Sequence, residues 1–108
     1  MNIYHLTSVK EWQAAKTAGV YRAPSLETEG FIHCSTREQV VDSAQNHFAG
    51  RADLVLLCIQ SGVLVSALRL EGERLWPHIY GPLNLEAVER VVEFPLQADG
   101  TFQLPPGV

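Results

Sequence analysis

Residues 53–96, DLVLLCIQSGVLVSALRLEGERLWPHIYGPLNLEAVERVVEFPL, contain four apolar segments separated by short connections. The segments are DLVLLCI (53–59), SALRLEG (66–72), PHIYGPL (77–83) and RVVEFPL (90–96). Parallel neighbouring strands need a crossover of a dozen or more residues, and these connections are too short to provide one. We therefore expect antiparallel strands, with the nearly continuous apolar run 53–59 at the centre of a sheet.

The preceding half of the chain predicts two helices, each next to a strand. A strand is expected at residues 2–6, and Ser8 with Glu11 has the spacing that begins a helix, which Gly19 would end. A second strand is expected at residues 30–35 (GFIHCS), and Thr36 with Gln39 repeats the same spacing. The helix that follows would present one apolar face and end at Gly50; this face consists of Val40, Val41, Ala44 and Phe48. The elements together predict an α+β fold with a largely antiparallel sheet.

Length and composition predict one folded domain. The chain has 108 residues, of which 46% are apolar and 19% are charged, as in an ordinary globular protein. We expect a single domain over residues 1–108, with its core at about 2–96. Residues 97–108 would form a C-terminal extension that contains a turn, a short extended piece and a frayed tail.

Charge and hydropathy exclude several classes of partner. Eight Lys and Arg against twelve Asp and Glu give a net charge of −4, which disfavours binding along a long nucleic acid. The longest apolar run, residues 54–59, is far shorter than the ~20 residues of a membrane helix. No basic stretch with an apolar core begins the sequence, so we expect a cytoplasmic protein that contacts no membrane. Cys34 and Cys58 lie far apart without a CxxC spacing and are expected to be buried thiols.

Polar side chains recur two residues apart on the predicted strands, which places them on one face of each strand. The pairs are His5 with Thr7, His33 with Ser35, Arg69 with Glu71, and His78 with Tyr80. The residues between them, Leu6, Cys34, Leu70 and Ile79, would face the core. The alternative is an ordinary solvated sheet face, but such faces usually carry Lys, Glu, Thr and Gln. Three of the four histidines in such pairs favour a ligand cleft.

The segment GFIHCST also brings His33 and Ser35 to a helix N-terminus, where the free N–H groups of Ser35 and Thr36 would favour an anion. An ordinary capped helix without a ligand is the alternative. Arg22 and Ser25, in the loop held by Pro24, could supply further donors, although a surface salt bridge is also open to Arg22.

The aromatic, histidine and cysteine residues offer further candidate sites, which their spacing supports less well. Tyr80 before the Gly81–Pro82 turn could stack on a planar ligand, whereas Trp76 is expected to pack and His47 is given no role. A zinc site from three separate histidines has no local ligand pair to support it, so no metal is expected. Strand parity turns Cys34 away from its neighbours, which disfavours a cysteine nucleophile.

Four segments resemble those of the DUF952 family of small, mostly bacterial proteins of uncharacterised function. They are IYHLTS (3–8), YRAPSLETEGFIHCS (21–35), LRLEGE (68–73) and PHIYGPL (77–83), and the resemblance runs over residues 3–95. It implies an ADP-ribosyltransferase-like fold: two small, largely antiparallel sheets with two or three helices and a cleft that binds NAD. His5 matches the first-strand position that holds a ribose. Tyr80 would take the aromatic position and Glu71 the acidic one, although the acid comes before the aromatic here, which departs from the usual order.

These observations lead to a functional hypothesis. The protein would bind NAD, ADP-ribose or another small phosphorylated or nucleotide-like ligand, with no cofactor required and NAD as a possible substrate. Arg69 and the Ser35–Thr36 helix start would hold phosphate. His33 or His78 would exchange a proton, and Glu71 would stabilise a cationic sugar in glycosyl transfer or hydrolysis. A non-catalytic sensor and a protein-interaction module on the same fold are the alternatives.

Overall fold

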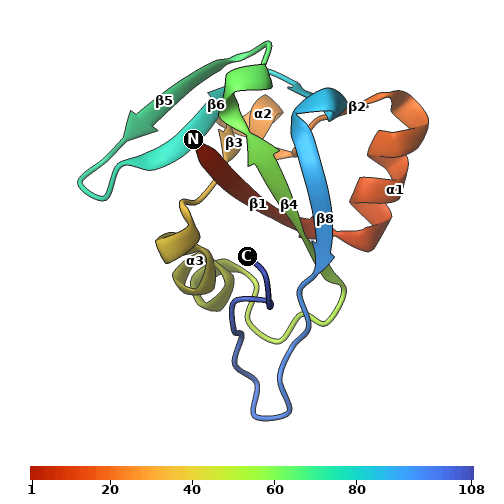
Figure 1. Cartoon of the computed structure of the whole chain (residues 1–108), viewed down its shortest axis with the longest axis vertical. Helices are drawn as coiled ribbons and strands as arrows, with labels where there is room; N and C mark the ends of the chain where they lie inside the picture. Colours follow the sequence, from red (N-terminus) through yellow and green to blue (C-terminus); the bar gives the residue numbers. More distant parts are fainter.

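The computed structural model describes residues 1–108, and its central layer is a three-stranded antiparallel sheet. Strand β4 (Leu54–Gln60) lies in the middle, between β1 (Asn2–Ser8) and β8 (Val88–Glu93), as Figure 1 shows. All seven β4 residues except the last are buried, which confirms the expected central strand. Both strand pairs of this sheet are antiparallel, although long stretches of chain separate its neighbouring strands.

Two smaller sheets accompany this layer. Strands β3 (Ile32–His33), β6 (Trp76–Tyr80) and β5 (Ala67–Glu71) form a second sheet in the order β3-β6-β5, and β2 (Val20–Tyr21) pairs with β7 (Leu83–Asn84) in a separate ribbon. The ribbon was not expected. A single antiparallel bridge between Tyr4 and Ser35 links the second sheet to the edge of the first.

The helices follow from local capping signals. Helix α1 (Val9–Ala18) begins where the Ser8 hydroxyl accepts the Glu11 N–H at 3.0 Å, and it ends at Gly19, whose φ of 83° is easy only for glycine. The predicted second helix is a 3₁₀ turn (Arg37–Gln39) followed by α3 (Val40–His47), and α2 (Ser25–Thr28) is one short turn. Further 3₁₀ turns lie at Ser61–Val63 and Leu85–Ala87. None of the helices combines the length and the apolar character that crossing a bilayer requires.

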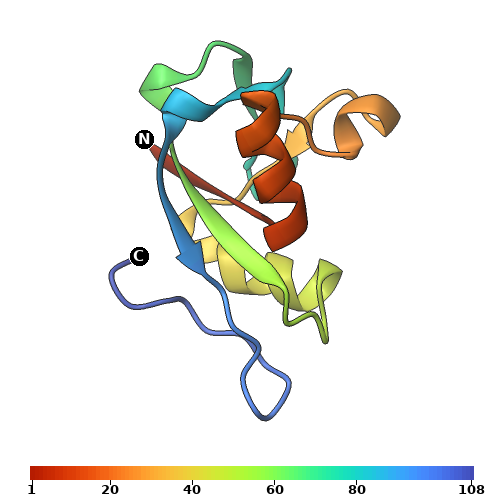
Figure 2. The ribbon, with the colours of Figure 1, turned by 90° about the vertical axis from the view of Figure 1, so that its right-hand side faces the viewer.

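The central sheet is covered on both faces, and the alternation of β4 divides the core in two. On one face lies the α1-side core, which comprises Ile3, Trp12, Ala15, Tyr21, Ala23, Ile32, Cys34, Val55, Leu57, Ile59, Ile79, Leu83 and Ala87. On the other lies the α3-side core, which comprises Tyr4, Leu6, Val40, Ala44, Leu54, Leu56, Cys58, Phe94 and Phe102. Figure 2 shows α1 standing beside the strands of this sheet.

Two expectations about packing were wrong. The C-terminal tail does not fray, because Arg37 donates to the Val108 carbonyl oxygen at 2.8 Å and Val108 packs against the α3-side core. Phe102, in the expected extended piece, is 3% exposed within that core, and its N–H donates to Gln45 of α3 at 2.7 Å. The segment loops away from β8 and turns back towards α3 (Figure 1). Leu70 does not face the core but is 45% exposed, because β5 is an edge strand. Leu6, Cys34 and Ile79 are buried as expected.

Candidate functional site

A cavity of about 750 Å³ lies where edge strand β1 meets strands β3 and β6, and α3 closes its other side. Its polar lining comes from β1 (His5, Thr7), the loop and turn after β2 (Ser25, Glu29), and the β3 segment (His33, Ser35). Strand β6 adds His78, and α1, α3 and the loop after α3 add Glu11, Ser43, His47 and Arg51. Its size falls within the range of roughly 300–1,000 Å³ typical of small-ligand pockets. The fold therefore gathers all four histidines of the chain around one cavity.

His5 forms the floor of this cavity and is bound on both sides of its ring. Its Nδ1 lies 2.5 Å from the His33 carbonyl oxygen, and its Nε2 lies 2.7 Å from the Tyr21 hydroxyl. Burial lowers the pKa of His5 to about 4, so the ring is neutral at pH 7. A carbonyl can only accept, so the single ring proton is on Nδ1.

This tautomer fixes the direction of the neighbouring hydrogen bonds. Because Nε2 of His5 carries a lone pair, the Tyr21 hydroxyl donates to it. The Thr7 hydroxyl, 3.1 Å from the Tyr21 oxygen, is then the donor in that contact. Burial also raises the pKa of Tyr21, which keeps the phenol protonated. A chain of hydrogen bonds thus runs from Thr7 through Tyr21 and His5 to the backbone of β3, and it holds His33 in place.

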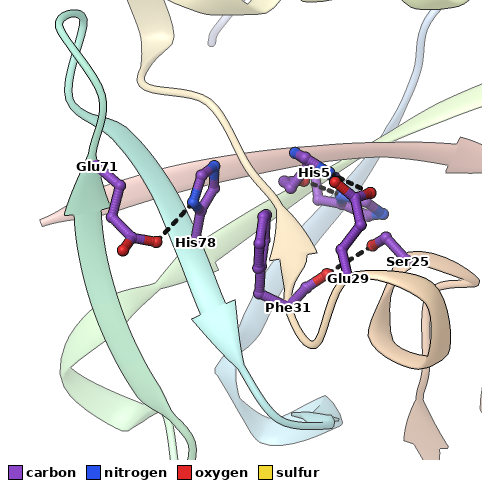
Figure 3. Close-up of polar contacts among 7 residues, drawn as sticks. His5, Ser25, Glu29, Phe31, Glu71 and His78 are labelled. Atoms are coloured by element: carbon purple, nitrogen blue, oxygen red, sulfur yellow. Dashed lines mark hydrogen bonds and ion pairs between the residues drawn. The ribbon is translucent and has the colours of Figure 1, made fainter.

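His33 and His78 are cross-strand partners at the mouth of the cavity, and each is paired with a carboxylate. Their ring centroids are 5.3 Å apart at an interplanar angle of 80°. Nε2 of His33 lies 2.9 Å from Glu29, and Nδ1 of His78 lies 2.8 Å from Glu71. Figure 3 shows Phe31 between the Glu71–His78 pair on one side and His5, Glu29 and Ser25 on the other.

Phe31 fixes the positions of both imidazoles. Its ring stacks on His78, with centroids 4.1 Å apart, and meets His33 edge to face at 4.8 Å. The backbone at Phe31 is held in turn by the Ser25 hydroxyl, which donates to the Phe31 carbonyl oxygen at 2.6 Å. The two imidazoles are therefore held by aromatic packing as well as by their carboxylates.

Glu71 connects His78 to Tyr80. The same oxygen, Oε1, accepts from His78 and from the Tyr80 hydroxyl, the latter at 2.5 Å. These two hydrogen bonds hold the pKa of Glu71 below its usual value, with Tyr80 the larger cause, and the same contact raises the pKa of Tyr80. The Arg69 guanidinium lies 5.1 Å from the centre of the Tyr80 ring. Glu71 is thus an ionised partner of His78 that lies outside the cavity lining.

The structure brings together six of the eleven residues predicted for the site. His5, Thr7, Ser25, His33, Ser35 and His78 line the cavity. Glu71 and Tyr80 adjoin it through His78, whereas Arg69 lies beyond Tyr80. Arg22 is exposed and lines a separate, shallow depression beside α1. Thr36 is outside the lining, and the predicted anion-binding N–H groups are occupied: that of Thr36 by Gln39 at 3.0 Å and that of Ser35 by the Tyr4 carbonyl at 2.7 Å.

Several lining residues were not found from the sequence. Glu29 escaped notice because its relation to His33 depends on the turn between α2 and β3. His47 and Arg51 lie at the end of α3 and in the loop after it, and no local pattern relates them to a distant strand. Arg51 donates from Nε and Nη2 to both carboxylate oxygens of Asp53, at 3.0 and 2.7 Å. Only the tertiary fold reveals Glu29, His47 and Arg51 as neighbours of the cavity.

The buried thiols and the candidate metal ligands add no further chemistry. Cys34 lines the cavity but is 3% exposed, and burial raises the pKa of its thiol, so the thiolate is disfavoured. Cys58 is also buried, as expected. No three His, Cys, Asp or Glu side chains are grouped so that they could hold a metal ion.

Comparison with known proteins gives a family and a fold. The family model described as "Protein of unknown function (DUF952)" matches residues 6–91. The crystal structure of CC0527 from Caulobacter crescentus is 38% identical over 96% of this chain and 95% of that chain, with a TM-score of 0.88. A double mutant of CC0527 (34% identity, 96% and 95% covered, TM-score 0.85) and its solution NMR structure (37%, 95% and 92%, 0.83) are similar too. No curated protein matches the chain.

Proposed function

Since the chain belongs to the DUF952 family, whose function is unknown, we propose a function from its own cavity: it binds an ADP-ribose-type ligand such as ADP-ribose or NAD. The observation that carries this proposal is the convergence of His5, His33 and His78, from three different strands, on one cavity of about 750 Å³. A pocket of this size with a largely polar lining suits a ligand that combines planar rings, hydroxyls and phosphates. The cytoplasm, where such ligands occur, is the expected location.

The proposal also holds that the fold of this chain is similar to that of ADP-ribosyltransferases. Its support is the arrangement of a cavity beside two antiparallel sheets, with a histidine on the first strand. His5 differs from the role that the family resemblance implies, because both its ring nitrogens already have partners within the protein. We therefore give His5 a positioning role and assign the ligand contacts to His33, His78, Ser25 and Ser35.

Ligand binding is tested by the thermal unfolding of the purified protein with and without ADP-ribose, NAD, AMP and nicotinamide. A ligand at 100 times its dissociation constant stabilises the folded state by about 2.7 kcal/mol, which raises Tm by roughly 10 °C in a domain of this size. We expect ADP-ribose and NAD to raise Tm and nicotinamide alone to have little effect. The same Tm with every nucleotide would contradict the proposal and favour another small ligand or a protein partner.

Glycosyl transfer from NAD is a second candidate function, and the Glu29–His33 pair favours it because both side chains line the cavity. When the bond between nicotinamide and ribose breaks, nicotinamide leaves with the bonding electrons, and a carboxylate can stabilise the cationic sugar. The attacking water releases its proton to the solvent as its oxygen bonds to the sugar. Glu71, the carboxylate expected from the sequence, would act only through His78.

The two carboxylates offer a matched pair of variants for this reaction. If NAD is hydrolysed, Glu29→Gln should lower kcat for nicotinamide release more than Glu71→Gln does, because only Glu29 lines the cavity. The larger loss in Glu71→Gln would return the acidic role to Glu71. Binding of NAD without release of nicotinamide by the native protein would leave a non-catalytic ligand sensor.

A further inference from the structure

The arginines of the chain offer little to an anionic group in this cavity. Arg22 and Arg69 lie outside its lining. Arg51 lines it, but two of its nitrogens already donate to the Asp53 carboxylate, and Glu11 is near enough to help raise the pKa of Arg51. The charge of Arg51 is therefore largely compensated within the protein.

The cavity is not positive while its histidines are neutral. Its lining contains one Arg and no Lys, against the carboxylates of Glu11 and Glu29. One positive and two negative charges leave a formal charge of −1. The positive charge that balances an anionic ligand must therefore come from other side chains of the lining, and protonated imidazoles are the remaining source.

His33 and His78 each have one ring nitrogen without a partner in the protein. Nε2 of His33 is taken by Glu29 and Nδ1 of His78 by Glu71, which leaves Nδ1 of His33 and Nε2 of His78. The ring centroids are 5.3 Å apart, a separation that one pyrophosphate group can span. Phe31 packs against both rings and limits their movement.

The state of these free nitrogens depends on protonation. In a neutral imidazole the single proton is on the nitrogen that faces the carboxylate, so the free nitrogen carries a lone pair and can only accept. Phosphate diester oxygens are acceptors too, so they cannot hydrogen-bond with it. When the ring gains a proton, the free nitrogen becomes a donor and the ring becomes a cation.

We propose that Nδ1 of His33 and Nε2 of His78 form a subsite for the pyrophosphate of the ligand, and that these two rings take up protons when it binds. The subsite rests on the proposed function and identifies which part of an ADP-ribose-type ligand the histidines recognise. Each ring can donate to the anion through its free nitrogen only when it is protonated, because Glu29 and Glu71 hold the opposite nitrogens.

The titratable groups in direct contact with the two rings do not compete with them for the proton. His5, which contacts the backbone of His33 from β1, stays neutral because both its nitrogens are held inside the protein. Tyr80, from β6, shares Glu71 with His78 and is kept protonated by that contact. Glu29 and Glu71 are already bound to the rings as acceptors.

Calorimetric titration of the protein with ADP-ribose at pH 6, 7 and 8, each in two buffers of different ionisation enthalpy, measures the proton uptake directly. The pyrophosphate of ADP-ribose is a diester that does not titrate in this range, so the protons enter the protein. We expect a net uptake of up to two protons, and a dissociation constant that is larger at pH 8 than at pH 6. His33→Gln and His78→Gln should each reduce the uptake and weaken binding at pH 6.

Arg22→Gln is the matched control, because it removes an exposed positive charge outside the cavity and should retain the full uptake. A second probe, sulfate, is a dianion that does not titrate here, and its binding at pH 6 is followed through the imidazole NMR signals against chloride at equal ionic strength. Sulfate should shift the titration of the His33 and His78 rings to higher pH and leave that of His5 unchanged.

The outcomes separate this subsite from the proposed function. Binding of ADP-ribose without proton uptake, or with the same affinity at pH 6 and pH 8, would overturn the subsite and leave the proposed function standing. Sulfate binding with proton uptake, but no binding of ADP-ribose, would support the subsite and overturn the proposed ligand. If neither anion binds at pH 6, both proposals fail.

Discussion

His5 holds the floor of the cavity through hydrogen bonds that are sealed from water. Its Nδ1–H supports the backbone at His33, and the Tyr21 hydroxyl satisfies its Nε2. No buried side-chain nitrogen or oxygen in the protein is left without a partner, so this network is complete. Removing one member leaves another polar atom buried without its partner, which costs more than the hydrogen bond itself is worth.

Tyr21→Phe tests this network. The change removes the only donor to Nε2 of His5 and the acceptor of the Thr7 hydroxyl, so we expect a loss of about 1–3 kcal/mol in the free energy of unfolding. Urea denaturation at pH 7 measures it. Tyr80→Phe is the control, because that hydroxyl bonds Glu71 in a partly exposed position and should cost less. Equal losses in the two variants would contradict a special role for the Tyr21–His5 contact.

His5 also predicts how stability depends on pH. Burial lowers its pKa in the folded protein to about 4, against 6.5 for a free imidazole. The unfolded chain therefore binds the proton first as the pH falls, and the folded state loses about 3 kcal/mol between pH 6.5 and pH 4. Urea denaturation at several pH values measures the loss, and NMR should show that the His5 ring does not titrate above about pH 5. A His5 ring that titrates near pH 6.5 would contradict the prediction.

At the scale of the elements, the β5–β6 hairpin shows what the alternation of side chains along a strand cannot predict. The alternation of side chains places Arg69 and Glu71 on one side of β5, and the structure agrees, because both contact Tyr80 of β6. Parity does not say what lies opposite that side. The hairpin extends from β6 past the end of β3, so Glu71 contacts His78 and Tyr80, while the cavity lies beyond His78.

The C-terminal segment makes an element-scale prediction. Phe102 packs against Phe94, with ring centroids 5.3 Å apart, and completes the α3-side core. Phe102→Ala should therefore lower the free energy of unfolding by about 3–5 kcal/mol, as expected for a buried aromatic. Gln103→Ala, at an exposed neighbouring position, is the control and should change it by less than about 0.5 kcal/mol. A small effect of Phe102→Ala would mean that the segment frays after all.

At the scale of the whole molecule, local sequence signals predicted where helices and strands lie better than they predicted which segments contact one another. Ser8 and Gly19 mark both ends of α1 because capping depends on nearby atoms only. The run 53–59 predicted the central strand because a strand that is buried on both faces consists almost entirely of apolar residues. The pairing of Glu29 with His33 depends on the turn that joins α2 to β3, and the approach of Arg51 to the cavity depends on segments that are distant in the sequence. Neither leaves a periodic trace in the sequence.

The two core regions share strand β4, and this predicts that the molecule unfolds as one unit. Leu56 belongs to the α3-side core and Leu57 to the α1-side core, which also contains Trp12. Leu56→Ala should lower the free energy of unfolding by about 2–5 kcal/mol, and the urea midpoints from tryptophan fluorescence and far-UV circular dichroism should move together. Leu57→Ala, on the opposite face, should move both midpoints by a comparable amount. A fluorescence midpoint that stays at its native value in Leu56→Ala would mean that the two faces of the sheet unfold separately.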